Sequence, residues 1–232
     1  MRADHTECSN PPRIGDQSWR LIITNPDIQP IGFLLPNGCR ITHGTGATIK
    51  TPFATIPLTM HELYPGGTLA VPSTQRGQLG FIPFNHELRL PRHVHVTMAD
   101  RDEDRRLLAE RILVTGGVGL VELNGKIFVI PHGGLVDIPE GVPHTWTACP
   151  PGVELPDGTK ATGEFLMIYD YAEPTSFFPI EGTTTLGSMA DYVRYDGKLE
   201  DICFPELTAE QVKAEAAFVW NDGLVGPGAA RA

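Results

Sequence analysis

Two histidines, His93 and His95, are separated by one valine in the middle of the 232-residue chain. Side chains at positions i and i+2 of a β-strand project from the same face. A strand over residues 88–96 would therefore bring the two imidazoles together. Neutral imidazole binds iron, nickel, copper and zinc, so the pair predicts half of a metal site, with a hydrogen-bonded structural pair as the alternative.

A third histidine, His144, follows a segment in which glycine and proline recur at fixed spacing. Gly141 is free to adopt a positive φ, and Pro139 fixes its own φ at about −65°, which suits a tight entry into a strand that begins at His144. The sequence thus predicts a turn that aims His144. The agreement of two separately placed motifs favours the metal reading over a chance match.

These motifs resemble those of the cupin superfamily. The spacing G-x5-P-x-G-x2-H over residues 133–144 is similar to the second cupin motif. The sequence H-x-H at 93–95, followed by E-x6-G at 110–117, resembles the first motif carrying an insertion. The resemblance covers residues 80–172 and implies a small jelly-roll barrel of antiparallel strands.

By this resemblance, one divalent transition metal is held by His93, His95, Glu110 and His144. Three imidazoles and one carboxylate leave coordination positions open to substrate, water or dioxygen. Iron(II) is the first candidate for the metal, and zinc, manganese, nickel and copper are the alternatives.

The chain departs from the family pattern at two places. Ala148 stands where the second motif has asparagine, and 14 residues separate His95 from Glu110 where three or four are usual. Asp100 stands where an unexpanded motif would put its carboxylate. We favour Glu110 as the ligand because it opens an apolar segment, whereas Asp100 begins the charged run 100–106, a composition typical of a solvated loop.

Strand alternation gives further candidates around the site. Arg89 shares the face of His93, so it is a candidate anion binder. Arg89 and Glu110 are the two candidate catalytic residues, and the alternative for Arg89 is a structural residue held in an ion pair. Four apolar or aromatic residues are candidates for a substrate pocket, with core packing as the alternative: Trp146, Phe165, Met167 and Tyr169. An aromatic-lined pocket suits a small aromatic or polyketide-like molecule.

The positioning elements are predicted to be β-strands. Gly (25) and Pro (21) divide the chain into short segments rich in Val, Ile, Leu, Thr and Phe, which predicts an all-β fold. Asn124-Gly125 predicts a two-residue hairpin turn. We expect one cupin domain over residues 1–232, organised as a flexible N-terminus (1–18), N-terminal strands or an arm (19–87), a barrel core (88–172) and a C-terminal extension (173–232) with a helix over about 208–222 that begins at a Thr208/Gln211 capping box.

The composition excludes several functions. The net charge of −10 argues against nucleic acid as a partner. We find no apolar run of membrane-spanning length and no signal peptide, and the four cysteines (8, 39, 149 and 203) lack CxxC spacing, so we expect a cytoplasmic protein with reduced thiols. The resemblance implies a homodimer and a small-molecule substrate.

Three hypotheses about function follow from the resemblance. The first is an iron(II) dioxygenase or oxidase. The second keeps the metal as a Lewis acid in an isomerase, cyclase or decarboxylase. The third is a non-catalytic cupin that binds a small ligand. One fold hosts many reactions, so the site has to decide among them.

Overall fold

The computed structural model describes residues 33–34, 40–41, 48–64, 77–99, 101–221 and 223–231. The N-terminus predicted over 1–18 and most of the segment 19–47 lie outside these residues. The strands are β1 (Phe33–Leu34), β2 (Arg40–Ile41), β3 (Thr48–Lys50), β4 (Met60–Tyr64), β5 (Gln78–Asn85), β6 (His93–Thr97), β7 (Leu107–Leu108), β8 (Glu110–Leu123), β9 (Lys126–Pro131), β10 (Leu135–Ile138), β11 (His144–Ala148), β12 (Glu164–Tyr171), β13 (Thr175–Pro179), β14 (Ala217–Trp220) and β15 (Gly223–Val225). The helices are α1 (Ala209–Glu215) and the 3-10 turns η2 (Asp102–Asp104), η3 (Met189–Asp191), η4 (Leu199–Ile202) and η5 (Pro227–Arg231).

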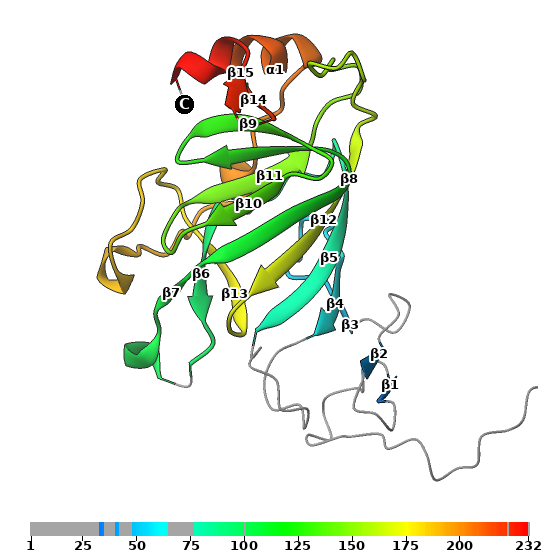
Figure 1. Ribbon diagram of the computed structural model, residues 1–232. Coiled ribbons are helices and arrows are strands. Elements are labelled where there is room, and N and C mark those ends of the chain that lie inside the picture. Colours follow the sequence, from blue (N-terminus) through cyan, green and yellow to red (C-terminus); the bar gives the residue numbers. More distant parts are fainter. Residues whose placement is uncertain are drawn as a thin grey trace, which may run out of the picture.

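The prediction of an all-β jelly roll is confirmed. Two curved antiparallel layers face each other, as Figure 1 shows. One layer has the order β3-β4-β5-β12-β8-β10, and the other has β13-β6-β11-β8-β9, with β14 and β15 beyond β9. The interior of such a fold lies between the two layers, where side chains fill it or leave room for a ligand.

The long strand β8 belongs to both layers. Residues 110–117 pair with β12, and residues 119–123 pair with β11. The change of partner falls at Gly117, whose φ of +68° no β-branched residue would adopt readily. A Cβ at this position would lie 2.0 Å from the Glu164 carbonyl oxygen, so the bend requires glycine. This bend turns the start of β8, at Glu110, away from the layer that carries β6 and β11.

The core lies between the two layers and follows the alternation of the strands. Along β12 the buried positions are Phe165, Met167, Tyr169 and Tyr171, and the residues between them are more exposed. Along β6 all five residues are buried, because Val94 and Val96 on its outer face pack against Leu107 and Ile180. Strand β6 is therefore covered on both sides, which holds its histidines in fixed positions.

The C-terminal region covers the outside of one layer. Helix α1 begins at the predicted capping box, in which Thr208 accepts from the Gln211 backbone N–H, but it ends at Glu215. The helix was expected to continue to about residue 222, and this C-terminal boundary is wrong. Residues Ala217–Trp220 instead form β14, which pairs in parallel with β9. Val212 packs with residues on the outer face of β8 and β9. The barrel also includes β13, which pairs with β6 although it follows residue 172, the expected end of the barrel core.

Two smaller expectations are confirmed, the hairpin turn and the exposed charged run. Asn124 and Gly125 both have a positive φ and form the β8–β9 hairpin turn. Arg101, Glu103 and Asp104 of the charged run are exposed around η2. Cys149 and Cys203 are free thiols. Within the described residues, every helix is too short or too polar to cross a membrane.

Candidate metal centre

Three histidines converge between the layers at the open end of the barrel. His93 and His95 project from the same face of β6, and His144, the first residue of β11, lies directly across from His93 in the register. One ligand nitrogen from each ring lies within 4.8 Å of the other two. All three residues are at most 2% exposed. The predicted cluster of three histidines is therefore present.

Each imidazole is oriented by a backbone carbonyl on its Nδ1 side. The Nδ1 atoms lie 2.8 Å from Pro91 O for His93, 3.3 Å from Ser176 O for His95 and 2.9 Å from Val142 O for His144. A carbonyl only accepts, so each Nδ1 carries the hydrogen. The three Nε2 lone pairs are left free for a metal, the arrangement that metal-binding histidines share.

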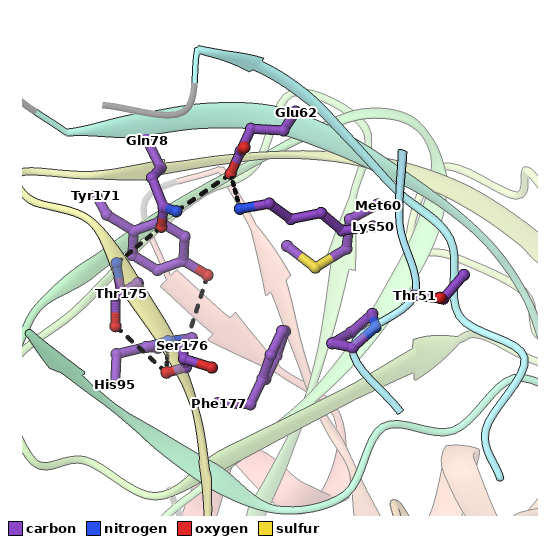
Figure 2. A pocket seen from close by; sticks show the side chains of 11 residues that line it. Lys50, Thr51, Met60, Glu62, Gln78, His95, Tyr171, Thr175, Ser176 and Phe177 are labelled. Carbon is purple, nitrogen blue, oxygen red and sulfur yellow. Dashed lines mark hydrogen bonds and ion pairs between the residues drawn. The ribbon is translucent and has the colours of Figure 1, made fainter. Parts of the chain in front are cut away.

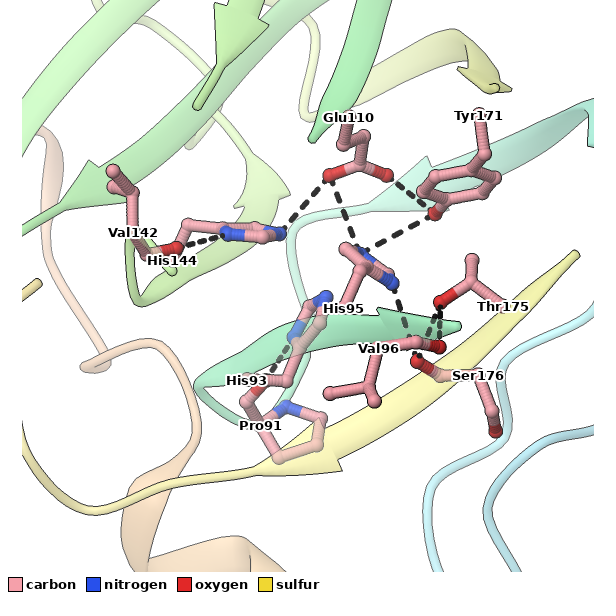
Figure 3. A network of polar contacts seen from close by, with 10 residues as sticks. All are labelled: Pro91, His93, His95, Val96, Glu110, Val142, His144, Tyr171, Thr175 and Ser176. Carbon is pink, nitrogen blue, oxygen red and sulfur yellow. Dashed lines mark hydrogen bonds and ion pairs between the residues drawn. The ribbon is translucent and has the colours of Figure 1, made fainter. Parts of the chain in front are cut away.

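The carboxylate of Glu110 completes the cluster from the other layer, as Figure 3 shows. Its Oε2 lies 3.0 Å from His144 Nε2 and 3.5 Å from His95 Nε2. Its Oε1 accepts a short hydrogen bond from the Tyr171 hydroxyl. Tyr171 therefore fixes one carboxylate oxygen and leaves the other directed at the imidazoles.

The long gap between His95 and Glu110 is closed by a hairpin-like excursion. After β6 the chain turns through η2 and returns as β7, which pairs antiparallel with β6 so that Leu108 lies opposite His95. Two hydrogen bonds join Thr97 and Arg106. The Thr97 hydroxyl accepts from the Arg106 backbone N–H, and the Thr97 backbone N–H donates to the Arg106 carbonyl oxygen. The insertion thus brings the chain back to the histidines, where β8 begins. Asp100, the alternative ligand, lies outside the described residues.

The donor set fits a divalent transition metal. Glu110 Oε2 and His144 Nε2 are both buried and neither has a hydrogen-bond partner, although they are 3.0 Å apart. Two donors each about 2.1 Å from one ion lie about 3.0 Å apart at a right angle and about 3.4 Å apart at the tetrahedral angle. The separations of Glu110 from His144 and from His95 match these values. A shared cation would satisfy atoms that are otherwise costly to bury.

The electrostatics favour the metal-binding protonation state of two of these residues, His93 and Glu110. Burial lowers the pKa of His93 well below its usual value, and the nearby His144 and His95 lower it further. Burial alone would raise the pKa of Glu110, but His95 and His144 hold it well below the usual range. A neutral imidazole and an ionised carboxylate are the forms that bind metal.

The turn before β11 is built as predicted. Gly141 has φ +76°, and a Cβ there would meet the Leu186 carbonyl oxygen at 2.4 Å. Leu186 N in turn donates to Gly141 O. The turn therefore packs tightly against the segment that follows β13, and this contact fixes the position at which the His144 strand begins.

Other predicted residues lie elsewhere. Arg89 is half-buried, and its guanidinium donates to Phe204 O in the C-terminal segment. Trp146 stacks on Phe165 with ring centroids 6.0 Å apart, and both are core residues, as are Met167 and Tyr169. None of these five lines the cavity beside His95. Trp146 lies two residues beyond His144 along β11, and Phe165, Met167 and Tyr169 precede Tyr171 on β12, so these four side chains lie further along their strands from the histidines.

That cavity has a volume of about 330 Å³ and borders the candidate metal centre at His95 and Tyr171. Figure 2 shows its lining, which includes His95, Tyr171 and Phe177 near the candidate metal centre, Gln78 beside Tyr171, and Lys50 and Glu62 further from the centre. Tyr171 continues the face of Tyr169 by one alternation step, so the sequence carried a signal for it. Lys50 and Glu62 stand more than 30 residues before His95, and no motif marks them.

The comparisons with known proteins concern the fold. No protein-family model and no curated protein matches the chain. Similar solved structures include a cupin-like protein from Thermotoga maritima (17% identity, TM-score 0.35, 55% of this chain and 78% of that chain) and the polyketide cyclase RemF from Streptomyces resistomycificus (15%, 0.39, 62% and 89%). The DMSP lyase DddQ from Ruegeria pomeroyi is a third (12%, 0.37, 55% and 56%), and the chain spans little more than half its length. The strand order and the paired histidine motifs give this chain a cupin-type fold.

Proposed function

We propose that the chain is a metal-dependent enzyme that acts on a small organic molecule. The observation that carries this proposal is the convergence of one ring nitrogen from each of three histidines and the Glu110 carboxylate beside a cavity of about 330 Å³. A metal held there would supply a Lewis acid or a redox centre with coordination positions open toward the cavity. The cavity volume lies at the small end of the range for ligand pockets, which suits a molecule of about one ring.

Tyr171 is the residue of the centre that holds a proton. Burial raises the pKa of its phenol well above the usual value, and the charge of Glu110 and the hydrogen bond to it raise the pKa further. The phenol therefore stays protonated at neutral pH and donates to Glu110 Oε1. Its oxygen also lies 3.4 Å from His95 Nε2, so it stands between the metal ligands and the cavity.

The groups in the cavity favour Lewis-acid chemistry, such as isomerisation, cyclisation or decarboxylation. A substrate oxygen at the centre would be polarised, while Tyr171 and Glu62, which line the same cavity, are placed to exchange hydrogen bonds or protons with the rest of the molecule. Zinc, manganese or nickel would serve such a reaction.

An iron(II) dioxygenase or oxidase is the second candidate. It is favoured by the ligand set itself, three neutral imidazoles and one carboxylate with open positions, which suits iron(II) and dioxygen. Phe177 and Met60 give the cavity an apolar wall that would shield a reactive centre from water.

The proposal is tested in two steps. Protein purified without chelator should contain close to one equivalent of transition metal, and a metal-free preparation that takes up none would leave the non-catalytic ligand-binding hypothesis. Metal-loaded protein should then be incubated with catechols, flavonols and polyketide phenols in an oxygen electrode. Turnover without oxygen uptake supports the Lewis-acid reaction, and oxygen uptake in step with turnover supports the oxidative one.

A further inference from the structure

A second buried carboxylate, Glu62 on β4, faces the same cavity as His95. Glu62 is 1% exposed. Its Oε1 accepts from Lys50 Nζ at 2.5 Å and from Gln78 Nε2 at 3.1 Å, whereas its Oε2 is buried without a hydrogen-bond partner. A buried carboxylate oxygen left unpaired is costly, so a residue in this state points to a ligand that pairs with it.

The Glu62 side chain is held in place by its two donors. Gln78 is itself fixed, because its Oε1 accepts from the Thr175 backbone N–H at 2.9 Å. Lys50 reaches in from β3 with its side chain 40% exposed, and it balances the charge of Glu62. Figure 2 shows Lys50 and Gln78 meeting on one oxygen of Glu62. The other oxygen is therefore presented in a fixed direction.

We propose that Glu62 determines substrate specificity by accepting a hydrogen bond, on Oε2, from a hydroxyl group of a substrate whose other end lies at the metal centre. This inference rests on the proposed function, because it needs a ligand that reaches from the metal into the cavity. His95, Tyr171 and Glu62 all line that cavity, so one molecule can contact both ends.

The neighbours of Glu62 favour a hydroxyl over other donors. Glu62 Oε2 can only accept a hydrogen bond, and Lys50 already balances the charge of Glu62. A neutral hydroxyl can donate to Glu62, whereas an ammonium group would add a second positive charge beside Lys50 and a carboxylate cannot donate. Met60 and Phe177 form an apolar wall for the body of the molecule. The substrate class is a small hydroxylated molecule with a separate metal-binding oxygen.

The experiment uses cobalt(II)-loaded protein and a matched set of probes: benzohydroxamate, 3-hydroxybenzohydroxamate and 4-hydroxybenzohydroxamate. The hydroxamate binds the metal, and the cobalt absorption bands report its dissociation constant without any turnover. At least one hydroxylated probe should bind roughly ten-fold more tightly than benzohydroxamate, the size expected of one hydrogen bond to a charged group. Glu62→Gln should abolish this preference while cobalt content and benzohydroxamate affinity stay unchanged.

Two variants serve as controls. Glu87→Gln removes an exposed carboxylate and should leave the preference intact. Glu62→Asp keeps the negative charge beside Lys50 but withdraws the carboxylate by one methylene, so it should keep its cobalt and reduce the preference about three-fold; it tests the inference even if Glu62→Gln fails to fold.

The outcomes separate the two proposals. If benzohydroxamate perturbs the cobalt spectrum but neither hydroxylated probe binds more tightly, or if the full preference survives in Glu62→Gln and in Glu62→Asp, Glu62 does not recognise a hydroxyl and the inference is wrong. If benzohydroxamate leaves the cobalt spectrum unchanged, the centre has no open position for a ligand, and the proposed function fails together with the inference.

Discussion

Replacing His144 with alanine should remove metal-dependent stabilisation while changing the stability of the metal-free protein only modestly. Two buried atoms of the candidate metal centre, Glu110 Oε2 and His144 Nε2, have no hydrogen-bond partner. Each unsatisfied buried polar atom costs about 1–3 kcal/mol, so a metal that satisfies both should recover about 2–6 kcal/mol. Independently, a metal present at about 1,000 times its dissociation constant stabilises the fold by about 4 kcal/mol.

These magnitudes translate into a measurable shift in melting temperature. For a chain of 232 residues, 1 kcal/mol corresponds to about 2–4 °C, so saturating metal should raise Tm of the wild-type protein by about 8–16 °C. The variant has lost one imidazole, and its shift should fall below about 2 °C. Without metal, the variant loses packing but also removes an unpaired nitrogen, so the two effects oppose each other and the net change should stay within about 2 kcal/mol.

The assay is differential scanning calorimetry of chelator-treated protein with and without added zinc, manganese or cobalt. His86→Ala, which removes an exposed histidine, is the matched control and should keep the full metal shift. An equal metal shift in His144→Ala and wild type would refute the reasoning, because the metal would then bind at another place.

Four further outcomes are expected. Tyr171→Phe leaves Glu110 Oε1 without its donor, and metal affinity measured against a chromophoric chelator should fall roughly ten- to hundred-fold; unchanged affinity would show that the phenol does not orient the carboxylate. Gly141→Ala places a Cβ 2.4 Å from a carbonyl oxygen and should cost about 3 kcal/mol or more in urea unfolding, whereas Gly133→Ala, also at positive φ but in open space, should cost about 1–2 kcal/mol; equal costs would argue against the tight turn. Burial raises the pKa of the Cys149 thiol from 9.0 to about 12, so its contribution to stability is present below pH 9 and is lost as the pH rises toward 12. Between pH 8 and 10.5 the wild-type protein should therefore lose up to about 2 kcal/mol more than Cys149→Ala, and parallel pH profiles would contradict this. Sedimentation should find a dimer, as the resemblance predicts, and a monomer at micromolar concentration would reject it.

The histidine cluster could be predicted because its signals are local. His93 and His95 share a face through the two-residue period of a strand, and His144 follows a turn whose glycine and proline positions fix the backbone. Glycine at 141 was expected to take a positive φ, and the structure gives it one. The all-β fold followed in the same way, from segment lengths and from the Asn124-Gly125 turn.

The pocket could not be predicted from strand alternation alone. Alternation says which side chains share a face, and it correctly groups Trp146 with His144 and Tyr169 with Tyr171. It does not say how far along the barrel each side chain lies. Each step of two residues moves a side chain about 6–7 Å along the strand, so Tyr171 reaches the metal centre while Trp146 and Tyr169 lie deeper in the core.

The position of Glu110 depends on two features that only the folded chain displays. The pairing of Leu108 with His95 sets where β8 begins. The number of residues inserted between His95 and Glu110 therefore does not change the position of Glu110 relative to the histidines. The bend at Gly117 then lets β8 pair with β12 at its start and with β11 at its end. Glu110 consequently approaches the histidines from the opposite layer, and the metal centre ties the two layers together at the open end. A metal bound there should thus stabilise the contact between the layers and not only the loops at the mouth of the barrel, which is why the calorimetric shift, and not metal content alone, is the measurement that tests the geometry.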